Sequence, residues 1–283
     1  MKQFCNKILY ILIFMSPLQT LSSIPFEAGI SVSGGERQKN RFDEGLRKFR
    51  TSIRLFTLNS VSVAQEPYTY SYEAFFRFPD ILGKGHTVGL SFGDKHLPEY
   101  RVKEIRTDGI INDLDWKFYS SYALINYTFM PDRHPFRLLR RWQFEIGGGF
   151  GPLINPEMAV KGYQSDLRWY EEWTSSQEAK YGMLYRFETA LSRRFFRFLR
   201  FRAGIRYDYL YMGGFEGNVN NSRGTFFYTF NGGIMPLSYT SYNLMYILVN
   251  SPLPEDAFPV ITDSILYKSA STEIFFSISA FTR

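Results

Sequence analysis

The feature that most constrains this chain is a strict alternation of apolar and polar residues. Over residues 68–78 every second residue is aromatic or apolar, and the residues between them include Glu73 and Arg77. In a β-strand these two sets point to opposite faces. One face of this segment therefore suits lipid and the other carries opposite charges, a combination that is typical of strands in outer-membrane β-barrels.

The same period of two recurs in segments of about ten residues, the length of a barrel strand. Two weaker segments, 226–234 and 242–249, also fit the pattern, and without them residues 213–272 would be one connection of about 60 residues, which is uncommon. The sequence therefore predicts an all-β fold, a closed antiparallel transmembrane β-barrel, with ten strands preferred and eight as the close alternative. The clear segments are 26–33, 68–78, 86–92, 117–129, 142–150, 181–191, 199–211 and 273–281.

Residues 1–23 have the pattern of an export signal. Lys2 and Lys7 precede an apolar run over residues 8–15, and small residues follow at 20–23. The apolar run is too short for the roughly 20 residues of a membrane-spanning helix. We therefore expect a signal peptide over residues 1–23, an outer-membrane β-barrel domain over residues 24–283, and a location in the cell outer membrane.

The connections between the expected strands alternate in length. The short connections are residues 79–85, 130–141, 192–198 and 235–241, and the long connections are residues 34–67, 95–116, 152–180 and 251–271. Short periplasmic turns and long outer loops are the usual asymmetry of such barrels, so both termini should lie on the periplasmic side. Two of the short turns, at 135–142 and 194–201, place Arg beside large apolar residues. This is typical of a turn at an anionic lipid surface, or of Arg side chains that cap strand ends.

Composition narrows the possible chemistry. Cys5 is the only cysteine and lies in the expected signal, which excludes disulfides and thiolate chemistry in the exported chain. His occurs at three positions with no spaced pair, so we predict no metal site and no cofactor. The net charge of +6 is too mild to indicate nucleic acid. Aromatic residues make up 18%, and Tyr and Trp prefer the membrane interface, which favours outer-membrane lipid as a partner.

Charged residues recur on the inward face of the expected strands. The interior of an eight-stranded barrel is just filled by side chains, and ten strands leave little more room. Opposite charges packed there should pair, because an unpaired buried charge costs several kcal/mol. We predict a plug of ion pairs, with a narrow channel lined by both signs as the alternative. The residues of this lumen charge network are Glu73, Arg77, Glu145, Arg186, Glu188, Arg202, Arg206, Asp208 and Glu273, and Glu27 and Arg200 share their inward parity.

Two tripeptides invite comparison with a catalytic site. Omptin proteases activate water with an Asp-x-Asp pair and an Asp-x-His pair, to which Asp113-Leu114-Asp115 and Asp94-Lys95-His96 are similar. Here the order along the chain differs, and both pairs lie on one hairpin instead of across the barrel mouth. We interpret them as solvated charge at the base of a loop. The sequence therefore predicts no catalytic residue and no enzyme, with an outer-membrane hydrolase as a minor alternative.

The whole pattern resembles the small outer-membrane barrels of the OmpX, OmpW and opacity-protein type. The resemblance covers nearly all of residues 24–283 and rests on the strand pattern, the opening at 26–31 and the terminal strand. Such barrels commonly end on Phe, whereas this chain continues after Phe281 with Thr282 and Arg283. The resemblance implies an adhesin, a surface shield or a conduit for small apolar molecules.

The leading functional expectation is a non-catalytic structural or surface-binding protein. Its outer loops would contact an extracellular ligand through exposed aromatic residues such as Trp169, Tyr170 and Trp173. The alternative is a narrow porin-like channel for small or apolar solutes. A soluble secreted β-sandwich is the remaining alternative fold, and it would need the Tyr and Phe rows to be buried between two sheets.

Overall fold

The computed structural model describes residues 25–39, 43, 60–105, 111–131, 142–165, 170–195, 198–221, 224–229 and 266–282. The expected signal peptide lies outside these residues, as does the segment 242–249. Among the described residues, no helix is long and apolar enough to cross a membrane.

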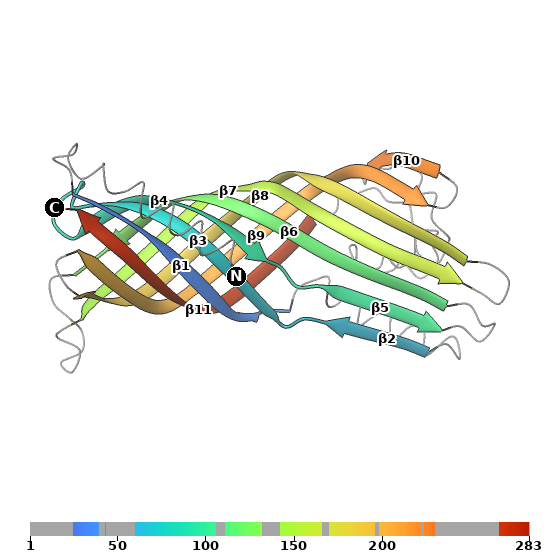
Figure 1. Ribbon diagram of the computed structural model, residues 1–283, viewed down its shortest axis with the longest axis horizontal. Helices are drawn as coiled ribbons and strands as arrows, with labels where there is room; N and C mark the ends of the chain where they lie inside the picture. The colour runs from blue at the N-terminus through green and yellow to red at the C-terminus, as the bar shows by residue number, and fades with distance from the viewer. Residues whose placement is uncertain are drawn as a thin grey trace.

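Eight strands close into one antiparallel up-and-down barrel (Figure 1). Each strand pairs with the next one along the chain, and β1 pairs with β11 to complete the ring. Closure leaves the ring without an edge, and every backbone group in the wall has a partner strand. The strands are β1 (Phe26–Arg37), β3 (Tyr68–Pro79), β4 (His86–His96), β6 (Ile111–Phe129), β7 (Gln143–Ser165), β8 (Tyr170–Phe195), β9 (Leu199–Asn221) and β11 (Leu266–Thr282).

The closed barrel is therefore the eight-stranded alternative and not the ten-stranded form that the sequence favoured. Of the two additional segments, only the start of the first is described, as part of β10 (Gly224–Thr229). This short strand pairs with the far end of β9 and does not enter the ring. An alternating sequence pattern alone does not distinguish these two situations.

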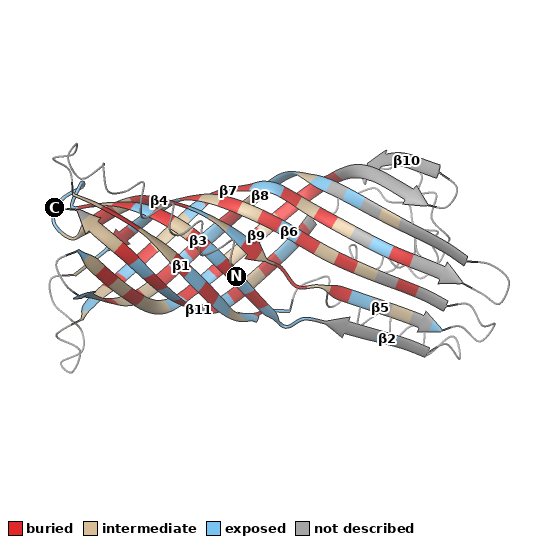
Figure 2. Cartoon of the chain, viewed as in Figure 1, coloured by how far each residue is buried: buried red, intermediate tan, exposed pale blue. Residues whose placement is uncertain are grey.

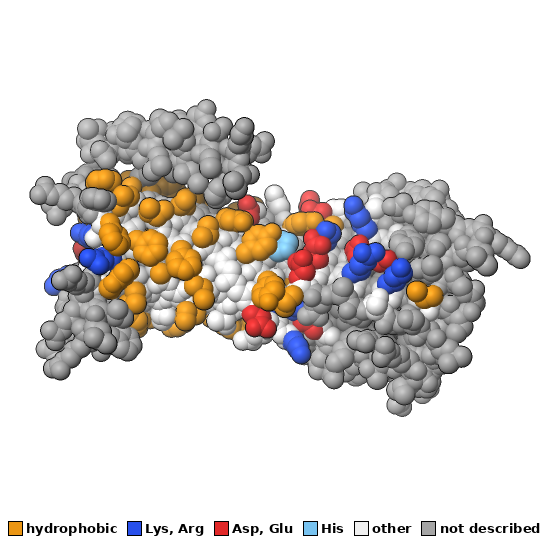
Figure 3. All heavy atoms as spheres, turned by 60° about the horizontal axis from the view of Figure 1, so that its bottom comes forward, with side chains coloured by type: hydrophobic (Ala, Val, Ile, Leu, Met, Phe, Trp, Pro, Cys, Tyr) orange, Lys and Arg blue, Asp and Glu red, His pale blue; other side chains and the backbone are white. Residues whose placement is uncertain are grey.

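The outward face of the ring is an apolar band. Burial alternates residue by residue along each strand (Figure 2), as the period of two predicts. In β3 the aromatic residues Tyr68, Tyr70, Tyr72 and Phe76 are exposed. At about 3.4 Å per residue and a tilt of about 40°, eleven consecutive residues of a strand rise roughly 28 Å along the barrel axis, which is close to the thickness of a bilayer core. Figure 3 shows apolar side chains over this wall and charged ones beyond it.

Four strands continue well beyond the ring at one end of the barrel (Figure 1). There β6 pairs with β7 as far as Ile111 opposite Ser165, and β8 pairs with β9 as far as Trp173 opposite Asn221. Two short strands, β2 (Ser60–Gln65) and β5 (Tyr100–Ile105), widen this sheet alongside β6. We call β2, β5, β10 and the segments 111–118, 157–165, 170–178 and 214–221 the strand extension.

Prolines separate part of the strand extension from the ring. Pro67 lies between β2 and β3, and Pro98 lies between β4 and β5. Because proline has no N–H to donate, it interrupts the ladder of hydrogen bonds. The pairing resumes immediately, since the N–H of Glu66 donates to the carbonyl of Glu99 at 3.2 Å and Gln65 then faces Tyr100.

A β-bulge marks the same boundary on the opposite side of the sheet. The register between β6 and β7 shifts between Tyr119 and Ser121, where β7 contributes one extra residue. Asn155 lies in this bulge with a φ of 48°, a left-handed conformation that Asn tolerates better than most residues. The bulge and the prolines lie where the apolar band ends and the polar strand extension begins.

The apolar band generates a prediction about the residue at mid-height of β9. Ile205 is 56% exposed on the wall, so Ile205→Arg should destabilise the barrel in lipid vesicles by about 2–4 kcal/mol. The matched control is Ile105→Arg in β5, outside the ring, where the exposed fraction is 44% and we expect almost no change. Urea unfolding in vesicles measures both, and equal effects would contradict a lipid-facing band.

Candidate functional site

All nine residues predicted for the lumen charge network are buried, with their side chains inside the ring. The structure adds three charged residues to them: Glu27 and Arg200, which have the same inward parity, and Lys95. We had assigned Lys95 to solvated charge at a loop base, but β4 continues to His96 and carries Lys95 into the lumen. The lumen charge network thus has six acidic and six basic members among the described residues, and their formal charges cancel.

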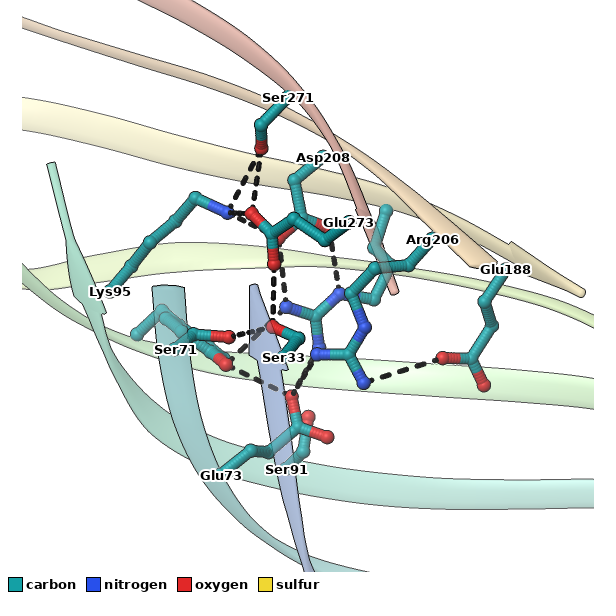
Figure 4. A network of polar contacts seen from close by, with 12 residues as sticks. Ser33, Ser71, Glu73, Ser91, Lys95, Glu188, Arg206, Asp208, Ser271 and Glu273 are labelled. Carbon is teal, nitrogen blue, oxygen red and sulfur yellow. Dashed lines mark hydrogen bonds and ion pairs between the residues drawn. The ribbon is translucent and has the colours of Figure 1, made fainter. Parts of the chain in front are cut away.

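The half of the network nearer the strand extension is centred on Asp208 (Figure 4). Its carboxylate accepts hydrogen bonds from Lys95 Nζ at 2.8 Å and from Arg186 Nε at 2.8 Å. Arg186 also pairs with Glu73, which accepts a further hydrogen bond from the hydroxyl of Tyr122 at 3.0 Å. Because each charged group has an oppositely charged neighbour, the desolvation cost of burying it is offset.

Small hydroxyl side chains complete this half of the network. Ser33 Oγ donates to Glu273 Oε2 at 2.5 Å and lies 2.6 Å from Ser71 Oγ. Ser271 Oγ donates to the other carboxylate oxygen of Glu273 at 2.8 Å, and that oxygen also pairs with Lys95. Lone pairs that the ion pairs leave unused are therefore satisfied by neighbouring strands.

The half nearer the chain termini is centred on Arg202. Its guanidinium donates to Glu145 Oε2 at 2.7 Å and to Glu188 Oε1 at 2.8 Å. Arg77 approaches the same two carboxylates at 3.7 and 3.4 Å. Below them Arg200 donates to Glu27 at 2.8 Å, closing the series of ion pairs along β9.

Arg206 connects the two halves, although its own contacts are loose. It donates one hydrogen bond, from Nη2 to Ser31 Oγ at 3.1 Å, and lies 3.8 Å from Glu73 and 3.9 Å from Glu188. Its Nε and Nη1 atoms have no hydrogen-bond partner. The half of the network nearer the strand extension otherwise contains three acidic and two basic residues, so the charge of Arg206 brings that half to neutrality. These five residues are Glu73, Asp208, Glu273, Lys95 and Arg186.

Aromatic rings fill the space between these charges. The guanidinium of Arg206 lies 4.5 Å from the centre of the Phe275 ring, and that of Arg202 lies 5.3 Å from the same ring. Arg77 is similarly placed 4.7 Å from the Phe75 ring. The ring face attracts the cation and displaces water, so these contacts favour a packed interior over a wet one.

Apolar side chains close the lumen above the charges, toward the strand extension. Phe118 stacks on Tyr267 at 4.1 Å between ring centres, and Tyr100 and Phe215 pack edge-on against Phe118. These four residues, which we call the aromatic cap, are nearly completely buried. Burial and the nearby Tyr267 raise the pKa of Tyr100 well above its ordinary value, so its hydroxyl stays neutral. The cap therefore closes this end of the lumen with uncharged rings, and the buried Arg37–Asp43 ion pair lies against it, with the guanidinium of Arg37 5.1 Å from the centre of the Tyr100 ring.

The two tripeptides that are similar to omptin catalytic pairs do not converge. Asp94 faces outward and accepts a hydrogen bond from Ser121 Oγ at 2.5 Å. Asp113 and Asp115 flank Arg101, at 2.7 and 3.6 Å. Asp94 pairs in register with Ser121, eight residues along β6 from Asp113, and His96 pairs with Tyr119, four residues from Asp115. The members of the two pairs therefore lie about 14–27 Å apart along the strand. His96 instead stacks on Tyr70 at 4.3 Å between ring centres.

Other expectations fall partly or wholly outside what the structure describes. Trp169 is outside it, and the side chains of Tyr170 and Trp173 in β8 are not described. The Arg-rich turn at 135–142 is also outside it, apart from Trp142. Among the described residues, no group of three or more His, Cys, Asp or Glu side chains is arranged to hold a metal ion.

Comparison with known proteins was made by sequence and by structure. Neither a protein-family model nor a curated protein matches the sequence. The crystal structure of the outer membrane protease OmpT from Escherichia coli is similar in fold, with 9% sequence identity and a TM-score of 0.41. The match covers 93% of this chain and 99% of OmpT.

The architecture is that of a small outer-membrane β-barrel. The wall is closed and antiparallel, its outward face is apolar, and its inward face is polar and charged. The resemblance inferred from the strand pattern is thus confirmed at the level of the fold. A soluble β-sandwich is excluded, because the rows of Tyr and Phe face outward instead of lying between two sheets.

The central position of Asp208 leads to a stability prediction. Asp208→Asn keeps the side-chain volume but leaves Lys95 and Arg186 facing a neutral amide in the lumen. The free energy of unfolding should fall by about 3–5 kcal/mol. In the matched control, Asp115→Asn alters an ion pair at the surface of the strand extension, and we expect a loss of about 0–1 kcal/mol. Denaturant unfolding in detergent micelles measures both, and a small effect at Asp208 would show that water screens the lumen.

Proposed function

We propose that this protein is a non-catalytic outer-membrane protein whose barrel is sealed and anchors a surface-binding strand extension. The observation that carries the proposal is the electrically neutral filling of the lumen. Paired charges, buried aromatic rings and the aromatic cap occupy the interior of the ring. A path for ions would need mobile water along the axis, and this packing favours a plug instead.

The strand extension supports the second part of the proposal. Its hairpins continue the wall without continuing the apolar band, and Arg101, Lys161 and Glu178 are exposed there. Paired strands hold the connecting segments away from the membrane more rigidly than free loops would. Such a platform suits contact with extracellular molecules, whose binding depends on a few anchoring aromatic and charged side chains.

Conductance across a planar bilayer tests the sealed lumen. We expect no discrete current steps from the wild-type protein, because no continuous aqueous path crosses the lumen charge network. Arg206→Ala removes the central guanidinium, whereas the control Arg101→Ala removes one from the strand extension. Wild-type steps that change with Arg206→Ala and not with Arg101→Ala would favour the narrow channel and contradict the plug.

Shortening the β7–β8 hairpin tests the binding platform. Lys161 faces Thr174 in register, so an Asn-Gly turn can replace residues 162–173 and remove Trp169, Tyr170 and Trp173. We expect this variant to keep the heat-dependent gel mobility of a folded barrel. Bacteria that display it should lose most of their adherence to immobilised extracellular-matrix proteins.

The control for this experiment keeps the hairpin length and changes Trp169, Tyr170 and Trp173 to Ser. Loss of adherence in both variants would assign the contact to the aromatic side chains. Unchanged adherence in both, at equal amounts of folded protein in the membrane, would contradict a binding role for this hairpin.

A further inference from the structure

A hollow of about 310 Å³ lies at the end of the barrel opposite the strand extension. Its wall is formed by the β3–β4 turn and by the adjoining ends of β6, β7, β8 and β9. The lumen is closed above it, where Arg200 pairs with Glu27 and Arg202 with Glu145. This terminal hollow is therefore a blind pocket at the end of the ring where β1 begins and β11 ends, and its volume lies at the lower end of the range for small-molecule sites.

The charges that line the terminal hollow are mostly positive. Lys84, Arg194 and Arg200 contribute cationic side chains, and Asp80 contributes the one carboxylate. The carboxylate of Asp80 stabilises the β3–β4 turn, because its Oδ1 accepts a hydrogen bond from the N–H of Gly85 at 2.7 Å. Arg200 is balanced by Glu27 within the lumen charge network, so the small formal excess of positive charge in the lining comes from Lys84 and Arg194 against Asp80.

Arg200, which lines the terminal hollow, has an unmade hydrogen bond. It is 2% exposed, and its Nε has no partner although its Nη1 donates to Glu27 at 2.8 Å. A buried donor without a partner costs about 1–3 kcal/mol, so this site favours an occupant that accepts hydrogen bonds.

We propose that the terminal hollow binds a phosphate group. A guanidinium offers forked N–H donors that match phosphate oxygens, and a lysine adds a compact positive charge. Gln143 and Trp142 in the lining supply neutral N–H donors. The volume leaves room for an organic group attached to the phosphate. The source of the phosphate is either a soluble phosphate ester or the headgroup of an anionic phospholipid in the adjacent leaflet.

Nuclear magnetic resonance of the indole N–H of Trp142 tests the proposal. The protein is labelled with ¹⁵N in maltoside micelles, which contain no phosphate, and inorganic phosphate is titrated at constant ionic strength. We expect the Trp142 resonance, assigned with Trp142→Phe, to shift and saturate. The resonance of Trp116, which is completely buried near the other end, serves as an internal reference and should not move.

Charge variants separate a built site from general attraction. Lys84→Gln combined with Arg194→Gln should weaken phosphate binding by roughly fivefold or more, since each partly exposed ion pair contributes up to about 1 kcal/mol. The matched control, Lys161→Gln with Lys180→Gln, removes one exposed charge from the strand extension and one next to it, and should leave binding unchanged. An equal loss in both variants, or no saturable shift in the wild type, would overturn the proposal.

A second arm distinguishes the two sources of phosphate. Nanodiscs that contain phosphatidylglycerol are compared with nanodiscs of a neutral glycolipid that lacks phosphate. A Trp142 shift with phosphatidylglycerol that free phosphate cannot compete away would identify a lipid headgroup. A shift that free phosphate produces in either nanodisc would identify a soluble ester. If neither phosphate nor phosphatidylglycerol moves the resonance, the hollow holds water only and the proposal fails.

Discussion

The structure depends on the requirement that every backbone hydrogen bond in a membrane be made within the protein. A β-sheet meets this requirement only by closing into a barrel, which here happens through the pairing of β1 with β11. Closure has a second consequence, because the period of two then sends half of all side chains into a narrow enclosed space. Charges that alternate with lipid-facing aromatic residues must therefore neutralise one another, and the lumen charge network is the result.

Buried ion pairs contribute little net stability, since desolvation consumes most of their attraction. Their arrangement here suggests a role in selecting the register of the strands. Arg186 and Asp208 are register partners between β8 and β9, as are Glu188 and Arg206. A slip of one residue would place these charges in lipid and the aromatic row in the lumen. The correct register is thus favoured by the large cost of every neighbouring register, more than by the strength of any single pair.

The alternating pattern was sufficient to predict the barrel, the inward face of its strands and nine members of the charge network. The prediction failed beyond the apolar band, where the strands no longer carry a row of lipid-facing apolar residues. Lys95 was missed because residues 95–116 were assigned to an outer loop and Lys95 to solvated charge at its base, although the parity of the third strand continued to His96. The strand extension was interpreted as loops, because strands surrounded by water on their outer face have no apolar row to mark them. The preferred strand count was wrong for a related reason, since alternation in residues 226–234 indicates a strand without showing whether it enters the ring.

The interior changes character along the barrel axis. The aromatic cap closes the end nearest the strand extension, and tight ion pairs follow around Asp208. Contacts loosen at Arg206, and ion pairs of 2.7–2.8 Å resume around Arg202 and Arg200. Among the described residues, buried polar side-chain atoms without a partner lie on Arg206 and in the half beyond it, at Thr87 Oγ1, Glu145 Oε1, Ser192 Oγ, Arg200 Nε and Ser277 Oγ. Water or a polar ligand satisfies such groups at little cost when it can enter from a nearby opening. An opening on the side of the termini serves this need while the end that carries the strand extension stays closed. In the two proposals made above, the same barrel blocks passage from one side and accepts a polar occupant from the other.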